Sequence, residues 1–264
     1  MRVRIIFGLI NKGGYVPFHH QYILADFIEK LLHKHHDELD TREAQYNFSG
    51  LKGQTRIGKD GLHFYSSKIT LVLSGPDKNF IDFFLRKLFL LNKIEIGKLH
   101  LKPMHVEKES LPAPSQEMKY LCLSPMVIMS HDNLNDSKKF VNPSSDLFSD
   151  LMYECLMNRM EQHGYSPEQL ADFYKFQIVP DEKYLSNIKN DDKKFARVFP
   201  VYINGDKYEV RGYTFPFTLY ADVHVQNFVL ENGIGYLTKK GFGMLDIANS
   251  DPNARVTPYD IPAE

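Results

Sequence analysis

The two halves of this 264-residue chain repeat one order of strand and helix patterns, and this repetition limits the possible folds more than any other feature. In the first half, the apolar and β-branched run at 3–10 predicts a strand. After Pro17, apolar residues recur at three- and four-residue spacing and predict a helix. The remaining elements complete the order βαββαβ: strands at 44–51 and 62–75, a helix at 77–92, and one or two strands at 93–108.

The second half follows a polar, proline-rich linker at 109–117. Its expected elements are an interrupted strand at 118–129, a helix at 144–164, strands at 172–180, 197–205 and 207–222, a short helix at 224–235, and a last strand at 242–248. Two successive βαββαβ units predict an α+β fold made of two tandem ferredoxin-like, or RRM-like, domains. The expected boundaries are 1–110 and 116–248, with 249–264 as a frayed tail.

Composition sets the class of protein. The chain is 43% hydrophobic and 13% aromatic, which is enough for a core, so disorder is not the default expectation. Its two cysteines, Cys122 and Cys155, provide neither a disulfide framework nor a zinc-binding spacing, which indicates a reducing compartment. The N-terminal apolar run is too short for a signal peptide, and no run approaches the roughly 18 apolar residues of a membrane span. We therefore expect a soluble, cytoplasmic protein without a membrane partner.

Charge is unevenly distributed along the chain. The net charge of −1 argues against a surface that binds polyanions everywhere. Residues 1–110, however, carry 17 Lys and Arg against 12 Asp and Glu, together with eight of the 11 histidines. The remainder is acidic, with 15 basic and 21 acidic residues. An anionic ligand is therefore expected mainly on the N-terminal half and at local basic loops.

One such loop is the stretch GIGYLTKKGFG at 233–243. Two Gly-hydrophobic-Gly pairs flank the adjacent cations Lys239 and Lys240, and glycines allow backbone N–H groups to approach an anion closely. The P-loop pattern is absent, and Thr238 stands where the dinucleotide fingerprint needs its third glycine. Both nucleotide-cofactor interpretations fail, and no cofactor is expected. A tight helix-to-strand connection, with glycines at the helix cap and the strand entry, remains as a structural alternative.

The spacing Gly-h-Gly-x5-Gly-h-Gly ahead of a final strand resembles the signature of the RAMP superfamily. In particular, it is similar to that of the CRISPR repeat-processing endoribonucleases, which cut precursor CRISPR RNA into guide units. The segments HHQYIL at 19–24 and MKYLCLSPMVIM at 118–129 also resemble this family, and the likeness covers roughly 1–248. It implies CRISPR repeat RNA as the partner of a monomer or homodimer, with assembly into a CRISPR effector complex as a further option.

The resemblance implies metal-independent cleavage, in which the 2′-hydroxyl attacks the neighbouring phosphate and leaves 2′,3′-cyclic phosphate and 5′-hydroxyl ends. Such a reaction needs a base, an acid and cations, and histidine suits the proton transfers near neutral pH. The family often places a histidine at the end of the first helix, where His36 is our first candidate and His33 the second. His35 continues the apolar stripe of the helix. A solvated His-rich helix end and a His-x-His-His metal site are the alternatives.

Two further positions follow from the resemblance. Relatives often carry a tyrosine late in the first helix, where this chain has Glu29. A lysine that stabilises the transition state matches Lys52, with Arg56 in reserve, and the alternative for both is an ordinary loop charge. The expected RNA contacts come from both halves: Gly233, Gly235, Lys239, Lys240, Gly241 and Gly243 in the glycine loop, with Arg56, Lys59 and His20 from the first domain.

Two other functions compete with this interpretation. A non-catalytic RNA-binding subunit of a larger CRISPR interference complex would share the fold and the glycine loop. An unrelated ferredoxin-like binding module would show no preference for CRISPR repeat RNA. The acidic second half counts against a strong RNA binder, because such proteins are usually more basic.

Overall fold

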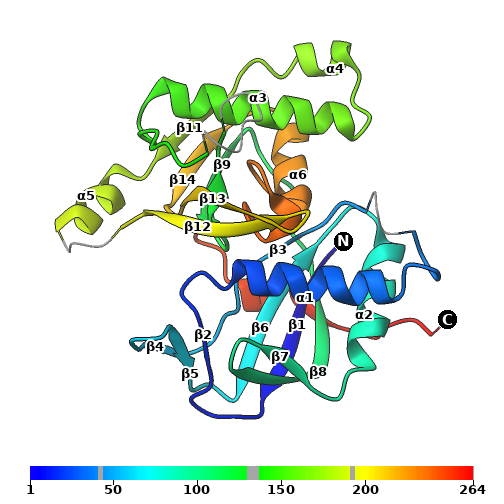
Figure 1. Cartoon of the computed structure of the whole chain (residues 1–264). Helices are drawn as coiled ribbons and strands as arrows, with labels where there is room; N and C mark the ends of the chain where they lie inside the picture. The colour runs from blue at the N-terminus through cyan, green and yellow to red at the C-terminus, as the bar shows by residue number, and fades with distance from the viewer. Residues whose placement is uncertain (41–43, 130–136, 191–193, 264) are drawn as a thin grey trace. The chain divides into compact units, whose positions relative to one another are not determined.

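The computed structural model describes residues 1–40, 44–129, 137–190 and 194–263, which form two compact units (Figure 1). Unit 1 comprises Met1–Leu111 together with Lys239–Gly241 and Asp251–Glu264. Unit 2 comprises Pro112–Thr238 and Phe242–Ser250. The chain therefore returns twice to its first unit, once at the tip of the glycine loop and once at its end.

Unit 1 has a ferredoxin-like sheet. Across the sheet the strands are β16 (Val256–Tyr259), β8 (Leu99–Glu109), β1 (Arg2–Leu9), β6 (Lys68–Ser74) and β3 (Asn47–Phe48), all antiparallel, with β7 (Ile94–Ile96) paired to β8. Its helices are α1 (Gln21–Lys34) and α2 (Lys78–Phe89). A smaller sheet contains β2 (Tyr15–Val16), β5 (Leu62–Phe64) and β4 (Thr55–Ile57). The order β8-β1-β6-β3 is the one expected of a βαββαβ unit in which both crossover connections are helices.

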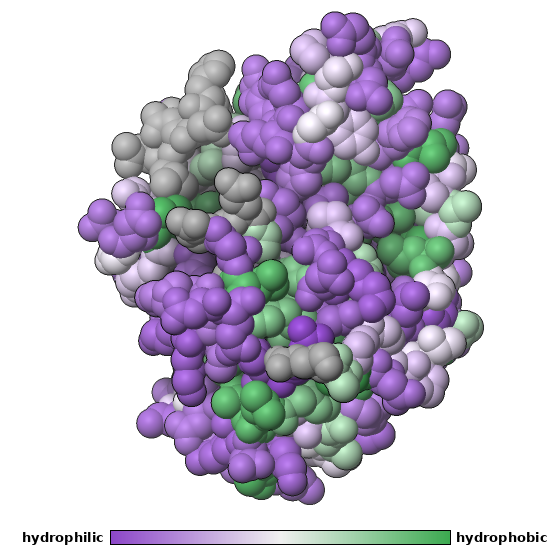
Figure 2. All heavy atoms as spheres, turned by 90° about the vertical axis from the view of Figure 1, so that its right-hand side faces the viewer, coloured by the Kyte–Doolittle hydropathy of each residue, from purple (hydrophilic) through white to green (hydrophobic). Residues whose placement is uncertain are grey.

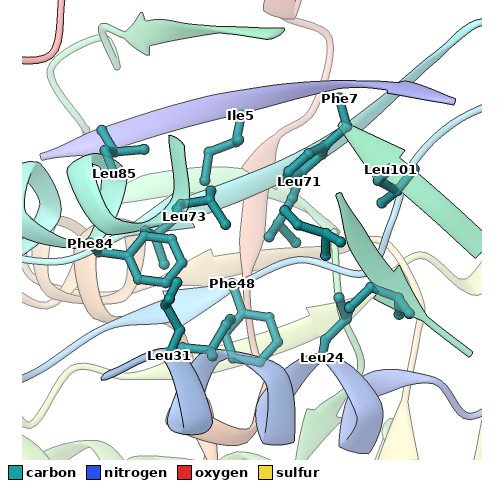
Figure 3. Close-up of a cluster of buried hydrophobic side chains, with 14 of the residues drawn as sticks. Ile5, Phe7, Leu24, Leu31, Phe48, Leu71, Leu73, Phe84, Leu85 and Leu101 are labelled. Atoms are coloured by element: carbon teal, nitrogen blue, oxygen red, sulfur yellow. The ribbon is translucent and has the colours of Figure 1, made fainter. Parts of the chain in front are cut away.

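The core of unit 1 lies between the sheet and the helices α1 and α2 (Figure 3). Leu24, Ile28 and Leu31 recur at the three- and four-residue spacing of one helix face, and all are buried. On β1, the alternate residues Ile5 and Phe7 point to the same face of the sheet and join this cluster. Burial of this helix face fixes the rotation of α1, so the polar residues at its C-terminal end must face outward.

Unit 2 repeats the arrangement. Its sheet contains, in order, β11 (Gln177–Pro180), β14 (Phe217–Tyr220), β9 (Glu117–Cys122) and β15 (Leu245–Ile247), with helices α3 (Asp146–Gln162) and α6 (Val223–Asn232). A separate sheet contains β10 (Met126–Val127), β13 (Asp206–Tyr213) and β12 (Ala196–Ile203). Unit 2 also contains the short helices α4 (Pro167–Ala171) and α5 (Glu182–Asn190), whereas η1 (Thr238–Lys240) belongs mainly, and η2 (Pro252–Arg255) wholly, to unit 1. The prediction of an α+β fold with two tandem ferredoxin-like units is confirmed.

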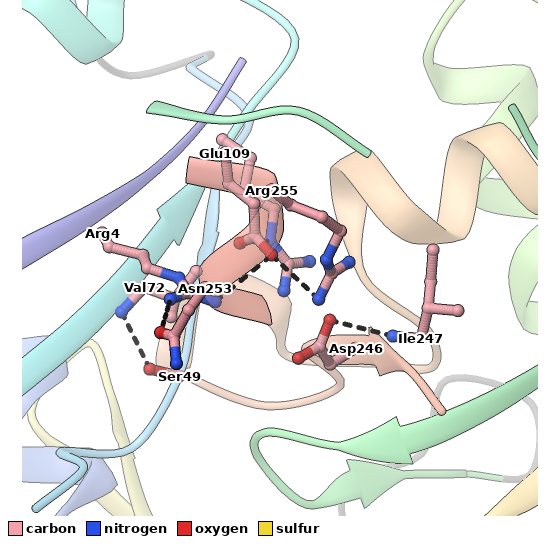
Figure 4. Close-up of polar contacts among 9 residues, drawn as sticks. Arg4, Ser49, Val72, Glu109, Asp246, Ile247, Asn253 and Arg255 are labelled. Atoms are coloured by element: carbon pink, nitrogen blue, oxygen red, sulfur yellow. Dashed lines mark hydrogen bonds and ion pairs between the residues drawn. The ribbon is translucent and has the colours of Figure 1, made fainter. Parts of the chain in front are cut away.

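The C-terminal segment differs from the frayed tail that we expected. Residues 256–259 pair with β8 as an edge strand, and the edge position tolerates Pro258. Just before this strand, Arg255 lies 3.1 Å from the carboxylate of Glu109 (Figure 4). The same carboxylate accepts a 2.8 Å hydrogen bond from Arg2. These charges come from segments far apart in sequence, so local patterning could not reveal that the segment is anchored.

The surface is mainly polar. On the face shown in Figure 2, hydrophobic residues form small groups between hydrophilic ones. Among the described residues, no helix has the length and apolar character that a membrane crossing needs. The most exposed large apolar side chain of the described surface is Ile57 on β4, which is 81% exposed. It is flanked by Arg56 and followed by Lys59, so the β4–β5 hairpin carries both apolar and basic groups.

Candidate functional site

The two candidate histidines meet at the end of α1. His33 lies in the last turn of the helix and His36 in the turn that follows, and both are exposed. Their ring centroids are 5.3 Å apart, with the rings edge to face. His36 Nδ1 lies 2.8 Å from the carbonyl oxygen of His33. A carbonyl can only accept a hydrogen bond, so Nδ1 must carry the proton in the neutral ring and Nε2 is left as the basic atom.

An acidic neighbour completes this arrangement. Asp37 Oδ1 lies 3.1 Å from His36 Nε2, where it can accept a hydrogen bond once that nitrogen is protonated. Both side chains are largely exposed, at 59% for His36 and 91% for Asp37. The His36 side chain can therefore be reached from solvent by a large substrate.

The turn that carries His36 is fastened to α2. Glu38 Oε1 lies 2.8 Å from His35 Nδ1, and Glu38 Oε2 pairs with the ammonium group of Lys87 on α2. The hydrogen bond from Lys87, and then that from His35, lower the pKa of Glu38. The side chain of His35 is only 20% exposed, in keeping with its place at the end of the apolar stripe. His35 thus serves to hold the turn, and His33 and His36 remain accessible.

The other candidate cations of unit 1 lie in the segment 52–59. Lys52 is exposed, and its backbone exchanges two 2.9 Å hydrogen bonds with Thr70 of β6. The Arg56 guanidinium lies 5.0 Å from the ring centroid of Tyr65, and Lys59 is exposed in the turn between β4 and β5. All three cations are therefore on the surface of the unit that carries the histidines.

His20 lies in the interior, which differs from the exposed position expected of an RNA contact. It is 5% exposed, its Nδ1 is 3.3 Å from the carbonyl oxygen of Pro17, and its Nε2 accepts a 3.4 Å bond from the backbone N–H of Leu51. Burial lowers the pKa of His20 to about 4, so the ring is neutral at physiological pH. Through these contacts, His20 links the start of α1 to the segment that follows β3.

All four glycines of the 233–243 loop have positive φ angles, between 72° and 84°. A Cβ at Gly243 would lie 1.8 Å from the carbonyl oxygen of Ile234, and one at Gly235 would lie 2.4 Å from that of Val127. One at Gly241 would lie 2.5 Å from the ring of Phe48. Side chains cannot fit here, so backbone conformation and close packing account for these glycines without any ligand.

Several amides of the same loop are already used inside the protein. Gly233 N–H donates to Val229 at 3.0 Å, where it caps α6, and Gly243 N–H donates to Pro125 at 2.7 Å. All four glycines of the loop are buried. These two amides are thus not directed at an external phosphate, and the structural alternative for the glycines is well supported.

Arg159 on α3 organises this loop, and sequence reasoning did not identify it. Its guanidinium donates to the carbonyl oxygens of Gly233 and Gly235, both at 2.9 Å, and to that of Asn232 at 2.7 Å. The guanidinium carbon also lies 5.3 Å from the ring centroid of Phe228. Burial of the charge lowers the pKa of Arg159. These contacts span more than 70 residues of sequence, so no local pattern signals them.

The tip of the loop belongs to unit 1, which differs from its expected assignment to the second domain. Lys240 forms an ion pair with Glu29, which lies on the same helix as His33. Gly241 packs on Phe48 of β3. The basic tip and the histidine-bearing helix are therefore parts of one compact unit, although the flanking residues of the loop belong to unit 2.

One alternative for the histidines at 33–36 was a His-x-His-His metal site. Within the described ranges, no three His, Cys, Asp or Glu side chains are grouped so that they could hold a metal ion. The ring nitrogens of His35 and His36 instead contact carboxylate and carbonyl oxygens of neighbouring residues.

Two ferredoxin-like units in tandem, with a glycine-rich loop ahead of the last strand of the second, match the plan that the resemblance to RAMP-type proteins implies. Residues 106–247, more than half of the chain, match the family described as CRISPR associated protein Cas6, C-terminal. The chain belongs to the Cas6 family.

Individual relatives agree with this assignment. The CRISPR-associated endoribonuclease Cas6 1 of Methanocaldococcus jannaschii is 26% identical over 242 residues, which cover 87% of this chain and 86% of the relative. A solved RAMP protein binding different RNA substrates matches with a TM-score of 0.73 and 18% identity, covering 94% of this chain and 100% of its own. The product of a Cas6-related gene from Pyrococcus furiosus matches with a TM-score of 0.73 and 19% identity, covering 95% and 99%. At these identities the solved structures establish the fold.

Proposed function

We propose that this protein is an endoribonuclease that cuts precursor CRISPR RNA within its repeats. Membership of the Cas6 family supports the substrate, as do the endoribonuclease named among its relatives and the RAMP structure that binds RNA. The observation that carries the proposal is the exposed His33–His36 pair, in which the carbonyl of His33 holds His36 Nδ1 and Nε2, beside Asp37, is the nitrogen that we propose as the base. We place the enzyme in the cytoplasm, as a monomer or homodimer.

In the proposed reaction, His36 Nε2 takes the proton of the 2′-hydroxyl, whose oxygen attacks the adjacent phosphorus. The bond from phosphorus to the 5′-oxygen breaks, and His33 supplies the proton to that oxygen. The products are a 2′,3′-cyclic phosphate and a 5′-hydroxyl, and no metal ion is required. Lys52 contributes positive charge near the pentacoordinate phosphate, which carries more negative charge than the substrate. Asp37 stabilises the imidazolium of His36 after proton transfer.

RNA would be held chiefly through its phosphates. Lys239 and Lys240 at the loop tip and Arg56 and Lys59 on the β4–β5 hairpin are the proposed cations, because phosphate contacts from Lys and Arg dominate affinity for RNA. The glycines Gly233, Gly235, Gly241 and Gly243 act by shaping the loop that presents the lysines. His20 is given no RNA contact here, because its ring is buried.

The deciding experiment is cleavage of repeat RNA in EDTA by the full chain and by His36→Ala, with His105→Ala as the matched control. His105 is an exposed histidine on β8 that the mechanism does not use. We expect wild type and His105→Ala to yield products ending in cyclic phosphate, and His36→Ala to lose roughly 10²–10⁴-fold in rate, the range of general acid–base catalysis.

RNA with a 2′-deoxy residue at the cleavage site should bind and stay intact, because the nucleophile is missing. Cleavage that requires Mg²⁺, or unchanged cleavage by the double variant His33→Ala/His36→Ala, would contradict the mechanism. Tight binding of repeat RNA without any product would instead identify a non-catalytic RNA-binding subunit.

A further inference from the structure

The ion pair between Glu29 and Lys240 joins two residues that are 211 positions apart in the chain. The ammonium group is that of a proposed phosphate-binding lysine, and its side chain is 21% exposed. The carboxylate comes from α1, and the Glu29 side chain is 44% exposed. Both charges are thus partly open to solvent, which is the setting in which ion pairs are weak.

The backbone around Lys240 is held in place. Lys240 ends the 3-10 turn η1, and the next residue, Gly241, has a φ of 84° and packs tightly on the ring of Phe48. The lysine side chain therefore extends from a fixed point and can exchange one anionic partner for another without a rearrangement of the loop.

Glu29 also lies on the helix face that leads to the histidines. Residues 29 and 33 are four apart on α1 and share one face of the helix, and His36 follows in the next turn. A carboxylate at this place opposes the approach of a phosphate, because like charges repel. Pairing with Lys240 offsets that charge, so the two residues neutralise each other in the absence of RNA.

We infer that Glu29 holds Lys240 as an internal substitute for an RNA phosphate, and that the phosphate displaces Glu29 when RNA binds. This inference rests on the proposed function. Its consequence is that part of the attraction between Lys240 and RNA offsets the loss of the internal ion pair. A polyanion that contacts only the loop tip therefore binds weakly. An RNA that also contacts other parts of the protein binds well.

The test is a double-mutant cycle on RNA affinity. Repeat RNA with a 2′-deoxy residue at the cleavage site, which cannot be cut, is titrated against wild type, Glu29→Gln, Lys240→Gln and the double variant over a range of salt concentrations. Glu29→Gln should tighten binding by about two- to five-fold at low salt, the range given by a partly exposed ion pair. Lys240→Gln should weaken binding and reduce the salt slope by about 0.7, one released counterion. In the Lys240→Gln background, Glu29→Gln should have little effect.

Asp26→Asn is the matched control. Asp26 lies on the same helix and pairs with Lys30 at 2.8 Å, so its replacement removes the same charge without releasing the loop lysine. The inference is overturned if Glu29→Gln binds no tighter than Asp26→Asn, or if its gain persists in the Lys240→Gln background. Weaker binding by Glu29→Gln would show instead that the pair only fixes the loop. If wild type fails to bind repeat RNA, the proposed function falls together with this inference, whereas normal wild-type binding without coupling overturns this inference alone.

Discussion

Arg159 and Gly235 are joined by a 2.9 Å hydrogen bond from the guanidinium Nη1 to the glycine carbonyl oxygen. The same guanidinium donates to the carbonyls of Asn232 and Gly233 and lies 3.4 Å from the hydroxyl of Thr238. A buried charge is stabilised only when its donors are satisfied. The loop carbonyls thus solvate Arg159, and Arg159 in return fixes the path of the loop between α6 and its basic tip.

Replacement of Arg159 should therefore loosen the loop. Arg159→Met keeps the length of the side chain but leaves the loop carbonyls without their donor, and we expect a loss of about 3 kcal/mol in the free energy of unfolding. The free energy of unfolding of Arg159→Lys should lie between those of wild type and Arg159→Met. A single ammonium group cannot donate to several carbonyls at once as the planar guanidinium does. Urea denaturation measures the loss, and Arg197→Met, at an exposed position on β12, is the control. Equal stability of the Arg159 and Arg197 variants would contradict this role.

Replacing a glycine of the loop by alanine should cost much more stability than replacing another glycine with positive φ. Gly243→Ala would place a Cβ 1.8 Å from the carbonyl oxygen of Ile234, so the backbone must move, and we expect a loss of about 3 kcal/mol or more. Gly205→Ala is the matched control, since φ is 89° there and no atom lies within 4 Å of the added Cβ. It should cost only about 1–2 kcal/mol, the penalty of the left-handed conformation. Thermal unfolding of both variants provides the comparison, and similar costs would refute the packing argument.

The sequence predicted those features that depend on local patterning. Apolar spacing along α1 and α2 and the βαββαβ order were sufficient for the fold, because burial of one helix face and alternation along strands are periodic. The strand expected at 62–75 is instead β5 and β6, and α4 and α5 were not anticipated, since short elements carry little periodic signal.

The candidate site was only partly predictable. The histidines could be placed at the end of α1 because a helix stop is local. The tertiary contacts around this site were not visible, because Glu38 meets Lys87, and Glu29 meets Lys240, across long stretches of sequence. His20 shows the same limit, since its burial follows from the path of the chain at Leu51 and not from its neighbours in sequence.

Burial of His20 should make stability depend on pH. Its pKa is about 4 in the folded protein and 6.5 as the ordinary value, so below pH 6.5 the unfolded chain binds a proton that the folded chain does not. The stabilisation is complete above pH 6.5 and is lost as the pH falls toward 4, by about 3 kcal/mol in total. Urea denaturation of wild type and His20→Asn at pH 7 and pH 4.5 isolates this contribution. The stability difference between the two proteins should shrink at the lower pH, whereas His105→Gln should follow wild type. A difference that stays constant with pH would exclude His20 as the source.

Glu109 should anchor the C-terminal strand to unit 1. Its side chain is 1% exposed and lies 2.8 Å from Arg2, 3.1 Å from Arg255 and 3.6 Å from Arg4. Glu109→Gln keeps the size of the side chain but removes the negative charge that these arginines contact, and breaking a buried pair in this way costs about 3–5 kcal/mol. We expect faster hydrogen exchange at 256–259, where β16 pairs with β8, and earlier unfolding on heating. Glu107→Gln, a partly exposed position on the same strand, should change neither measurement. If hydrogen exchange at β16 is equally slow in the two variants, backbone pairing alone holds the strand and the charge cluster does not contribute.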